Sequence, residues 1–415
     1  MTAASDSYAV AFVRASCVNG VVRLFWLENA PYFDAHPERR ATEFSRVRIL
    51  RKDVGMIDER HAACCMPFGL DGAECVYDGP VARSATGSYE WTERVPESPV
   101  STVNYVYGIA TAWVDAIELI PVAARNPDMW WTYDTLMQRL AALCAAYPHA
   151  AALTACGQTV SGRAIPRLQI GARGPALGLV GLIHAGESGP ELMVPVLERL
   201  LAEERDLFSR VRVIAVPAVN IDQRERMVRG APYYLRVNAA GTDINRNFPA
   251  GWEEVATDYG LSSDDPGSVT YRGVAPASSP ETQAVMAALD EPGLRVVFSY
   301  HWMHSICALP ALSCRAGRDD AAYMAECRRW VEAYAAGLYA GRAYEPWFHD
   351  AGTSAGSLPT WLYETRRIPA FDCEGGTISC GYGTRDHSPF DVAMLADYRE
   401  RHFRAIRSIL VRLAE

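Results

Sequence analysis

The chain has 415 residues, of which 49% are hydrophobic and 21% charged, and its formal net charge is −9. This composition is ordinary for a globular protein, and the length exceeds what one hydrophobic core usually serves, so we expect two domains. The acidic balance argues against a general binder of nucleic acids or of anionic membranes. No apolar run approaches membrane-spanning length.

The start of the chain and its cysteines bear on the compartment. Residues 1–8 lack the basic and apolar regions of a signal peptide. The 11 cysteines are odd in number, and the adjacent Cys64 and Cys65 suit neither a four-thiolate zinc site nor a regular set of disulfides. Three others lie in apolar contexts typical of small buried side chains: Cys144, Cys156 and Cys307. We therefore expect reduced thiols and a cytoplasmic protein.

Residues 1–122 have the alternating pattern of β-strands. Side chains of opposite character alternate in the stretches 21–26, 46–49 and 103–109, and turn-forming sequences rich in Gly, Pro and Asp separate such stretches. The pattern predicts a small all-β sandwich, an accessory domain that resembles a fibronectin type III or immunoglobulin-like module. Nothing in this part of the chain looks catalytic.

After a predicted linker at 120–128, the periodicity changes, and strands alternate with helices through a predicted catalytic domain, 128–415. The expected helices lie at about 132–146, 190–204, 280–290, 319–341 and 391–413. The expected strands lie near 168–170 and at 177–183, 211–219, 294–300 and 368–373. This alternation predicts an α/β sheet with helices on both faces.

A His-x-x-Glu motif follows the apolar strand 177–183. Ligand-binding residues belong at such strand ends, because open α/β sheets bind in the crevice beyond the carboxyl ends of their strands. The side chains of His184 and Glu187 can both reach one metal ion. Taken alone the motif is weak, since a surface histidine and a helix-capping glutamate would look the same.

A third candidate ligand is His301, at the carboxyl end of the strand 294–300. Two histidines and one glutamate form a catalytic zinc site that leaves one position for water. His304 is an alternative, but it lies further beyond the strand end.

The loop 241–249 carries Asn245 and Arg246. A guanidinium is a planar fork that matches a carboxylate, and a neighbouring amide adds a further donor, so the pair could bind a substrate carboxylate. An Asn- and Asp-rich loop held by its own hydrogen bonds is an equally open interpretation.

Several motifs occur together in a specific order. They are His184-x-x-Glu187, Asn220-x-Asp222, Asp243-x-Asn245-Arg246-Asn247-Phe248, His301 and Glu374, with further matching segments at 157–163, 271–282 and 355–363. In this order the chain resembles the zinc carboxypeptidase A family over about residues 130–400. The resemblance implies a carboxypeptidase-like mixed sheet with helices on both faces, preceded here by the small all-β sandwich.

The resemblance also implies the catalytic roles. The three candidate ligands would bind Zn²⁺, and Glu374 matches the general base that takes a proton from the zinc-bound water. Glu364 and Asp372 are rivals for that role, but Glu374 has the strand-end position.

Four further residues match functional positions of the family, three of them on the substrate side. Arg236 matches the arginine that stabilises the developing oxyanion. Asn245 and Arg246 match the pair that binds the terminal carboxylate of the substrate. Asp243 matches a carboxylate that orients a ligand histidine.

The sequence departs from the family in places. The family's Asn-Pro-Asp-Gly turn is replaced by residues 220–223, Asn-Ile-Asp-Gln, and residues 302–303 after the third ligand are Trp-Met instead of Ser-Tyr or Ser-Gly. Ala351 occupies the place of the mobile tyrosine of the animal enzymes. Tyr344 and Tyr382 are nearby candidates for that tyrosine, although structural aromatic residues would also fit.

The sequence thus predicts a zinc metallocarboxypeptidase that hydrolyses the last peptide bond of a substrate with a free carboxylate. Leu358, at a specificity position, favours an apolar or aromatic terminal side chain. One alternative keeps the zinc but is an amidase or deacylase of the same fold, acting on N-acyl amino acids or cell-wall peptides. Another is a binding module on a non-catalytic peptidase scaffold. We expect no nucleic-acid or membrane partner.

Overall fold

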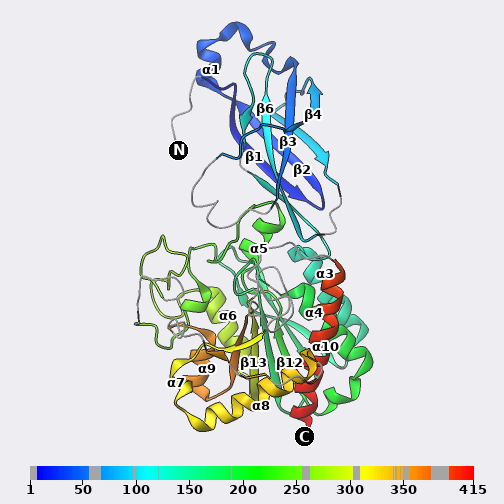
Figure 1. Ribbon diagram of the computed structural model, residues 1–415, viewed down its shortest axis with the longest axis vertical. Coiled ribbons are helices and arrows are strands. Elements are labelled where there is room, and N and C mark those ends of the chain that lie inside the picture. Colours follow the sequence, from blue (N-terminus) through cyan, green and yellow to red (C-terminus); the bar gives the residue numbers. More distant parts are fainter. Residues whose placement is uncertain are drawn as a thin grey trace. The chain divides into compact units, whose positions relative to one another are not determined.

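A computed structural model of the chain divides it into two compact units (Figure 1). The residues that the structure describes are 7–55, 67–96, 100–119, 121–187, 189–254, 262–301, 309–339, 341, 344–345, 347–348, 355–374 and 392–415. Unit 1 consists of Met1–Trp130 and Arg226–Tyr234, and unit 2 consists of Trp131–Glu225 and Leu235–Glu415. That 1–122 and 128–415 are separate domains stays a prediction.

Unit 1 contains two antiparallel sheets. One has the strand order β1-β2-β5, and the other has the order β4-β3-β6-β7, with β8 also paired to β6. The elements are β1 (Val10–Val18), β2 (Val21–Glu28), α1 (Ala30–Ala35), β3 (Val47–Gly55), β4 (Glu74–Gly79), β5 (Ser88–Arg94), β6 (Thr102–Ala110), β7 (Ile117–Glu118) and β8 (Val122–Arg125). The predicted antiparallel all-β region is therefore confirmed, whereas its likeness to a fibronectin type III or immunoglobulin-like module stays a prediction.

The alternation along β2 produces the core of unit 1. Val22, Leu24 and Trp26 are fully buried, and the indole of Trp26 stacks on the ring of Tyr89 at 5.9 Å. The expected linker is partly wrong, because residues 122–125 form the strand β8 instead. A four-residue strand between Pro121 and Pro127 has too few alternating positions to be recognised from sequence.

Unit 2 is built on an eight-stranded mixed sheet with the order β15-β14-β16-β13-β11-β12-β10-β9. Its strands are β9 (Ala151–Gln158), β10 (Ala164–Ile170), β11 (Ala176–Gly181), β12 (Arg212–Val216), β13 (Leu294–Tyr300), β14 (Leu309–Leu312), β15 (Trp347–Phe348) and β16 (Ala370–Glu374). The central strands β12, β11, β13 and β16 run parallel, β10 is antiparallel to β9 and β12, and β14 is antiparallel to β16 but parallel to β15.

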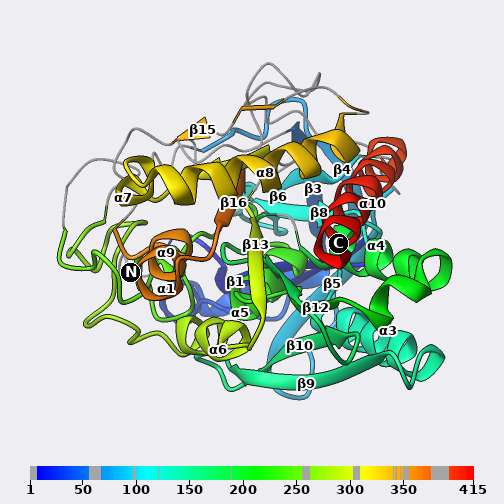
Figure 2. The same ribbon diagram turned by 90° about the horizontal axis from the view of Figure 1, so that it is seen from below.

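Helices cover both faces of this sheet, as the sequence predicts (Figure 2). The helices from residue 131 onward are α3 (Tyr133–Ala146), α4 (Pro190–Glu203), α5 (Ile221–Val228), α6 (Pro280–Leu289), α7 (Arg315–Arg318), α8 (Ala321–Leu338), α9 (Leu358–Arg366) and α10 (Val392–Ala414). Helix α10 packs against α4 and α8, whereas α6 packs against β9 and α9 against β16.

Side-chain caps fix where several of these helices begin. The side chains of Thr132, Ser279, Asp320 and Ser357 each accept a hydrogen bond from a backbone N–H in the first turn of α3, α6, α8 and α9 respectively. Such N-caps satisfy donors that the helix itself leaves without a partner.

The parallel strands matter for function because their carboxyl ends meet at one edge of the sheet. Strands β11, β13 and β16 are adjacent, and each is followed by, or ends in, a predicted site residue.

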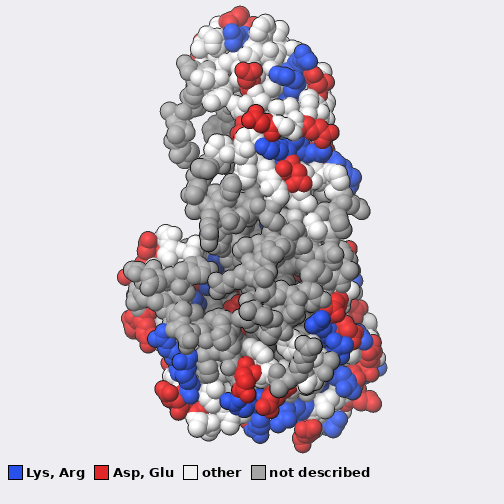
Figure 3. Space-filling model, in the orientation of Figure 1, with Lys and Arg blue, Asp and Glu red and all other residues white. Residues whose placement is uncertain are grey.

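The described surface mixes charges of both signs. In Figure 3, acidic and basic side chains are interspersed over the described residues of the visible face. Among the described helices, none is both long and apolar enough to cross a bilayer.

Candidate metal centre

His184 and Glu187 lie in the turn that joins β11 to α4. This turn is crowded, because a Cβ atom added at Gly181 or at Gly189 would come within 2.7 or 2.8 Å of the carbonyl oxygen of Pro217. Glycine at both positions therefore permits the close approach of two chain segments. The tight turn holds both candidate ligands at the carboxyl end of a central strand.

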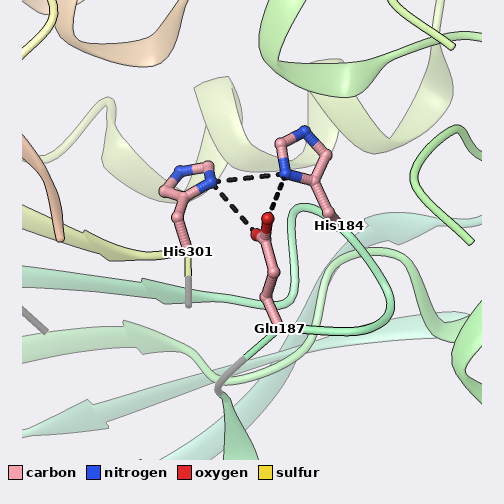
Figure 4. A group of neighbouring side chains, drawn as sticks. All are labelled: His184, Glu187 and His301. Carbon is pink, nitrogen blue, oxygen red and sulfur yellow. Dashed lines mark hydrogen bonds and ion pairs between the residues drawn. The ribbon is translucent and has the colours of Figure 1, made fainter. Parts of the chain in front are cut away.

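The three candidate ligands converge on one point (Figure 4). Nδ1 of His184 is 2.7 Å from Oε1 of Glu187, Nδ1 of His301 is 3.1 Å from Oε2 of Glu187, and the two Nδ1 atoms are 3.4 Å apart. All three residues are buried. The backbone N–H of His301 donates to the carbonyl of Cys373 at 3.0 Å, which extends the pairing of β13 with β16 by one residue.

This donor set fits Zn²⁺. Two imidazole nitrogens and one carboxylate are the protein ligands of catalytic zinc sites. With metal–ligand bonds of about 2.1 Å, donors at the corners of a tetrahedron lie roughly 3.4 Å apart, which is the separation of the two Nδ1 atoms. Within the part of the chain that the structure describes, these residues form the one group of His, Cys, Asp and Glu side chains close enough to hold a metal.

The charges around the ligands favour an ionised glutamate. Burial alone would raise the pKa of Glu187, but His184 and His301 beside it lower this pKa to about 2. A carboxylate is the form of glutamate that binds a metal ion.

Asp243 lies behind His184, where the resemblance expects it. Its Oδ1 is 3.0 Å from Nε2 of His184 and accepts a hydrogen bond from the backbone N–H of Asn245, and its Oδ2 accepts one from Nε of Arg236 at 2.8 Å. Burial alone would raise the pKa of Asp243, but Arg236 and His184 hold it well below its ordinary value. An ionised Asp243 can accept a hydrogen bond from Nε2 of His184, and its role in orienting that ligand histidine stays a prediction.

Asn245 and Arg246 belong to a short 3-10 turn and are buried. Oδ1 of Asn245 accepts a hydrogen bond from the backbone N–H of Leu358 at 2.9 Å, and its Nδ2 donates to Oδ2 of Asp372 at 3.4 Å. Nη1 of Arg246 donates to the carbonyl of Asn245 at 2.9 Å. The loop is thus held partly by its own hydrogen bonds, as one interpretation expected, and partly by bonds to residues 358 and 372, and it also contains a buried guanidinium. Its role in binding a substrate carboxylate stays a prediction.

Glu374 ends β16 and is partly buried. Burial raises the pKa of Glu374 to about 8, and the negative charges of Glu187 and Asp372 act in the same direction against His301 and Arg236. A carboxyl group with a pKa near neutrality can both accept and return a proton, which is the property that a general base and acid requires.

The two alternative candidates for the general base differ in burial. Glu364 is exposed on α9, whereas Asp372 is buried, with its Oδ1 3.1 Å from Nε2 of His301. Sequence reasoning treated Asp372 only as a possible base and missed its contact with a ligand histidine. The signal was available, because residues two apart on a strand share a face and Asp372 precedes Glu374 by two.

Other predicted positions lie outside the described residues, namely His304, Trp302, Met303, Ala351, Tyr382, Cys64, Cys65 and Cys307. Tyr344 is described, and its ring stacks on that of Tyr339 at 6.4 Å. This contact agrees with a structural aromatic residue, and the counterpart of the mobile tyrosine stays a prediction.

Comparison with known proteins gives one family and several relatives. Residues 136–382, more than half of the chain, match the family described as zinc carboxypeptidase. A metallocarboxypeptidase A-like protein of Trichophyton verrucosum is 25% identical over 229 residues, 49% of this chain and 53% of that protein. Murein peptide amidase A of Escherichia coli K12 is 40% identical over 125 residues, 29% of this chain and 48% of that protein. The matches thus span about half the length of these relatives.

A solved structure shows the same fold. Bovine thrombin-activatable fibrinolysis inhibitor, in its complex with tick carboxypeptidase inhibitor, superposes with a TM-score of 0.54 at 16% identity, covering 69% of this chain and 98% of that chain. This likeness confirms the predicted carboxypeptidase-like fold of the second part of the chain. Together with the family match over 136–382, it leads to one conclusion: the chain belongs to the zinc carboxypeptidase family.

Proposed function

We propose that the protein is a metallocarboxypeptidase, which hydrolyses the last peptide bond of a substrate that has a free α-carboxylate. The observation that carries the proposal is the buried group of His184, Glu187 and His301, whose donor atoms face one another. Family membership supports zinc-dependent hydrolysis, and the residues around the three candidate ligands support a substrate with a free carboxylate.

A zinc ion held by these three side chains would lower the pKa of a bound water to about 7 and polarise the scissile carbonyl. Glu374 takes a proton from that water and later returns it to the amine that leaves. The raised pKa of Glu374, about 8, supports both halves of this transfer.

Three further residues act on the substrate in this proposal. The guanidinium of Arg236, already fixed by its hydrogen bond to Asp243, stabilises the negative charge that develops on the carbonyl oxygen. Asn245 and Arg246 bind the terminal carboxylate. Because both are buried and held by backbone contacts, they are positioned before the substrate arrives.

A second candidate keeps the metal and changes the substrate. The stretch that is 40% identical to murein peptide amidase A supports an amidase of the same fold, acting on cell-wall peptides or N-acyl amino acids. A panel of peptides with free carboxylates and a panel of N-acyl amino acids and muropeptides separates the two. Release of single terminal residues supports the carboxypeptidase, and release of acyl groups or internal cleavage without terminal residues supports the amidase.

The decisive test of the mechanism is Glu374→Gln, and its matched control is Glu364→Gln, at an exposed position of α9. We expect Glu374→Gln to lower kcat about 10²–10⁴-fold while zinc content stays stoichiometric, and the control to keep wild-type activity. Unchanged hydrolysis in Glu374→Gln would refute the assigned base. Elemental analysis of His184→Ala tests the metal ligands, because zinc that stays bound at full stoichiometry would place the site elsewhere.

We further propose a reducing compartment, the cytoplasm. The described cysteines, which are Cys17, Cys75, Cys144, Cys156, Cys314, Cys327 and Cys373, are all free thiols, and this supports the proposal. Thiol counting on protein purified from its native cells, under denaturing conditions and without reductant, tests it; oxidised cysteines would argue for an exported protein.

A further inference from the structure

Strand register places four chemically active side chains on one face of the sheet. Strands β13 and β16 are parallel neighbours in which Ser299 lies opposite Asp372 and Tyr300 opposite Cys373. Alternate residues of a strand share a face, so Ser299 and His301 lie on the same side as Asp372 and Glu374.

Asp372 contacts residues from three other segments of the chain. Its Oδ1 is 3.1 Å from Nε2 of His301, its Oδ2 accepts a hydrogen bond from the hydroxyl of Ser313 at 2.8 Å, and the same oxygen accepts one from Nδ2 of Asn245 at 3.4 Å. The residue is only 4% exposed. A buried carboxylate needs such partners, since an unpaired charge away from water is strongly destabilising.

The arrangement repeats that of Asp243 on the other ligand histidine. Oδ1 of Asp243 is 3.0 Å from Nε2 of His184, and the backbone N–H of Asn245 donates to the same oxygen. Asn245 therefore contacts both carboxylates, one through its backbone and one through its side chain. Each ligand imidazole thus has a carboxylate beside its Nε2, the nitrogen that faces away from the proposed metal. Asn245, which is predicted to bind the substrate carboxylate, connects these two aspartates.

We propose that Asp372 is a positioning residue, which fixes the ring and the tautomer of His301 so that Nδ1 is presented to the metal. The inference rests on the proposed metal site. A carboxylate can only accept a hydrogen bond, so the nitrogen facing it carries the proton, and Nδ1 then keeps its lone pair for the ion. Such outer carboxylates also raise the basicity of the imidazole they contact.

Ser299 is the competitor for this role, because its hydroxyl oxygen is 2.9 Å from the same Nε2 of His301. A hydroxyl can donate as well as accept, so it does not by itself select the tautomer. Asp372 selects it, and Ser299 is a matched control that contacts the same atom.

Zinc affinity, measured by competition with a chromogenic chelator in the absence of substrate, tests the inference. We expect Asp372→Ala to weaken zinc binding about 10–100-fold and the isosteric Asp372→Asn about fivefold or more. Ser299→Ala and Ser313→Ala should stay within about threefold of the wild type, because the carboxylate remains in both. Cobalt-substituted Asp372→Asn should also show a shifted visible absorption spectrum, since the ligand ring is no longer held at the same angle.

The outcomes separate this inference from the proposed function. Wild-type protein without a tight zinc site would refute both, whereas tight wild-type binding with unchanged affinity in Asp372→Asn and Asp372→Ala would refute only the role of Asp372. A larger loss in Ser299→Ala than in Asp372→Asn would assign the role to the hydroxyl. If Asp372→Ala does not fold by circular dichroism, the affinity and spectrum of Asp372→Asn decide.

Discussion

The buried ion pair between Arg224 and Glu191 offers a sharp test of how the ligand-bearing turn is held. Nη2 of Arg224 donates to Oε1 of Glu191 at 2.6 Å, and Nη1 donates to the carbonyl of Ala185 at 3.1 Å. The backbone N–H of Trp131 donates to the same oxygen of Glu191 at 2.6 Å. Ala185 lies between the first two candidate ligands, so this pair fixes the turn between β11 and α4.

The magnitude follows from burial. Arg224 and Glu191 are 5% and 4% exposed, so Arg224→Met leaves the Glu191 carboxylate buried without the cation that it pairs with among the described residues. Breaking a buried pair in this way costs about 3–5 kcal/mol. The double variant Arg224→Met, Glu191→Gln removes both charges, and we expect it to recover about 2 kcal/mol relative to the sum of the single variants.

Urea denaturation of wild type, both single variants and the double variant measures the coupling. The matched control is Arg199→Met on α4, because Arg199 pairs with Glu203 at 2.8 Å and also with Glu400, and these three side chains are 40–50% exposed. This control should lose less than about 1 kcal/mol. A loss in Arg224→Met no larger than in Arg199→Met, or a coupling energy near zero, would refute the reasoning.

Three further outcomes are expected. Gly356 has φ of 63°, and a Cβ there would overlap the carbonyl of Arg246. Gly356→Ala should therefore displace Arg246, the proposed binder of the substrate carboxylate, and raise KM about tenfold. The control Gly162→Ala, with φ of 81° and open space around it, should leave KM unchanged, and equal KM values in the two variants would contradict the reasoning. Burial opposes ionisation of Asp222, but hydrogen bonds from Ser161 and others lower its pKa. The contribution of Asp222 to stability is therefore complete above about pH 4 and is lost as the pH falls through the folded-state pKa. In urea titrations, the difference in free energy of unfolding between wild type and Asp222→Asn should shrink at acid pH, and a constant difference would contradict this. Chelation should lower Tm, since zinc at 100 times its Kd stabilises the folded state by about 2.7 kcal/mol; an unchanged Tm would argue against a folded-state metal site.

The sequence predicts most of the fold because long periodic segments carry a strong signal. The strand 294–300 and the helices α3, α4, α6 and α10 appear within a residue or two of their expected bounds. The elements that were missed are short or carry no clear period. β14 and β15 have four and two residues, and α5 lies in what looked like a long loop. β9 (Ala151–Gln158) was also missed, because alanine at the start of this strand favours helices when nothing else decides.

The candidate ligands could be located from sequence because each follows an apolar strand, and parallel strands bring such positions together. What the sequence could not supply is register. Only the pairing of Ser299 with Asp372 brings that carboxylate to His301, and only the folded turn brings Arg236 to Asp243. Contacts between side chains more than 70 residues apart depend on how strands align, which local patterns leave undetermined.

The order of the central strands has a consequence for biogenesis. The three donor atoms come from residues 184–301, but the strand that pairs with β13 and carries Asp372 and Glu374 is β16, much later in the chain. Contacts of such long sequence separation form slowly and late. A nascent polypeptide on the ribosome would therefore acquire the three proposed zinc donors before the proposed support for His301, and high-affinity loading would wait until β16 has been synthesised and has joined the sheet. Metal uptake would then report the completion of folding rather than begin it.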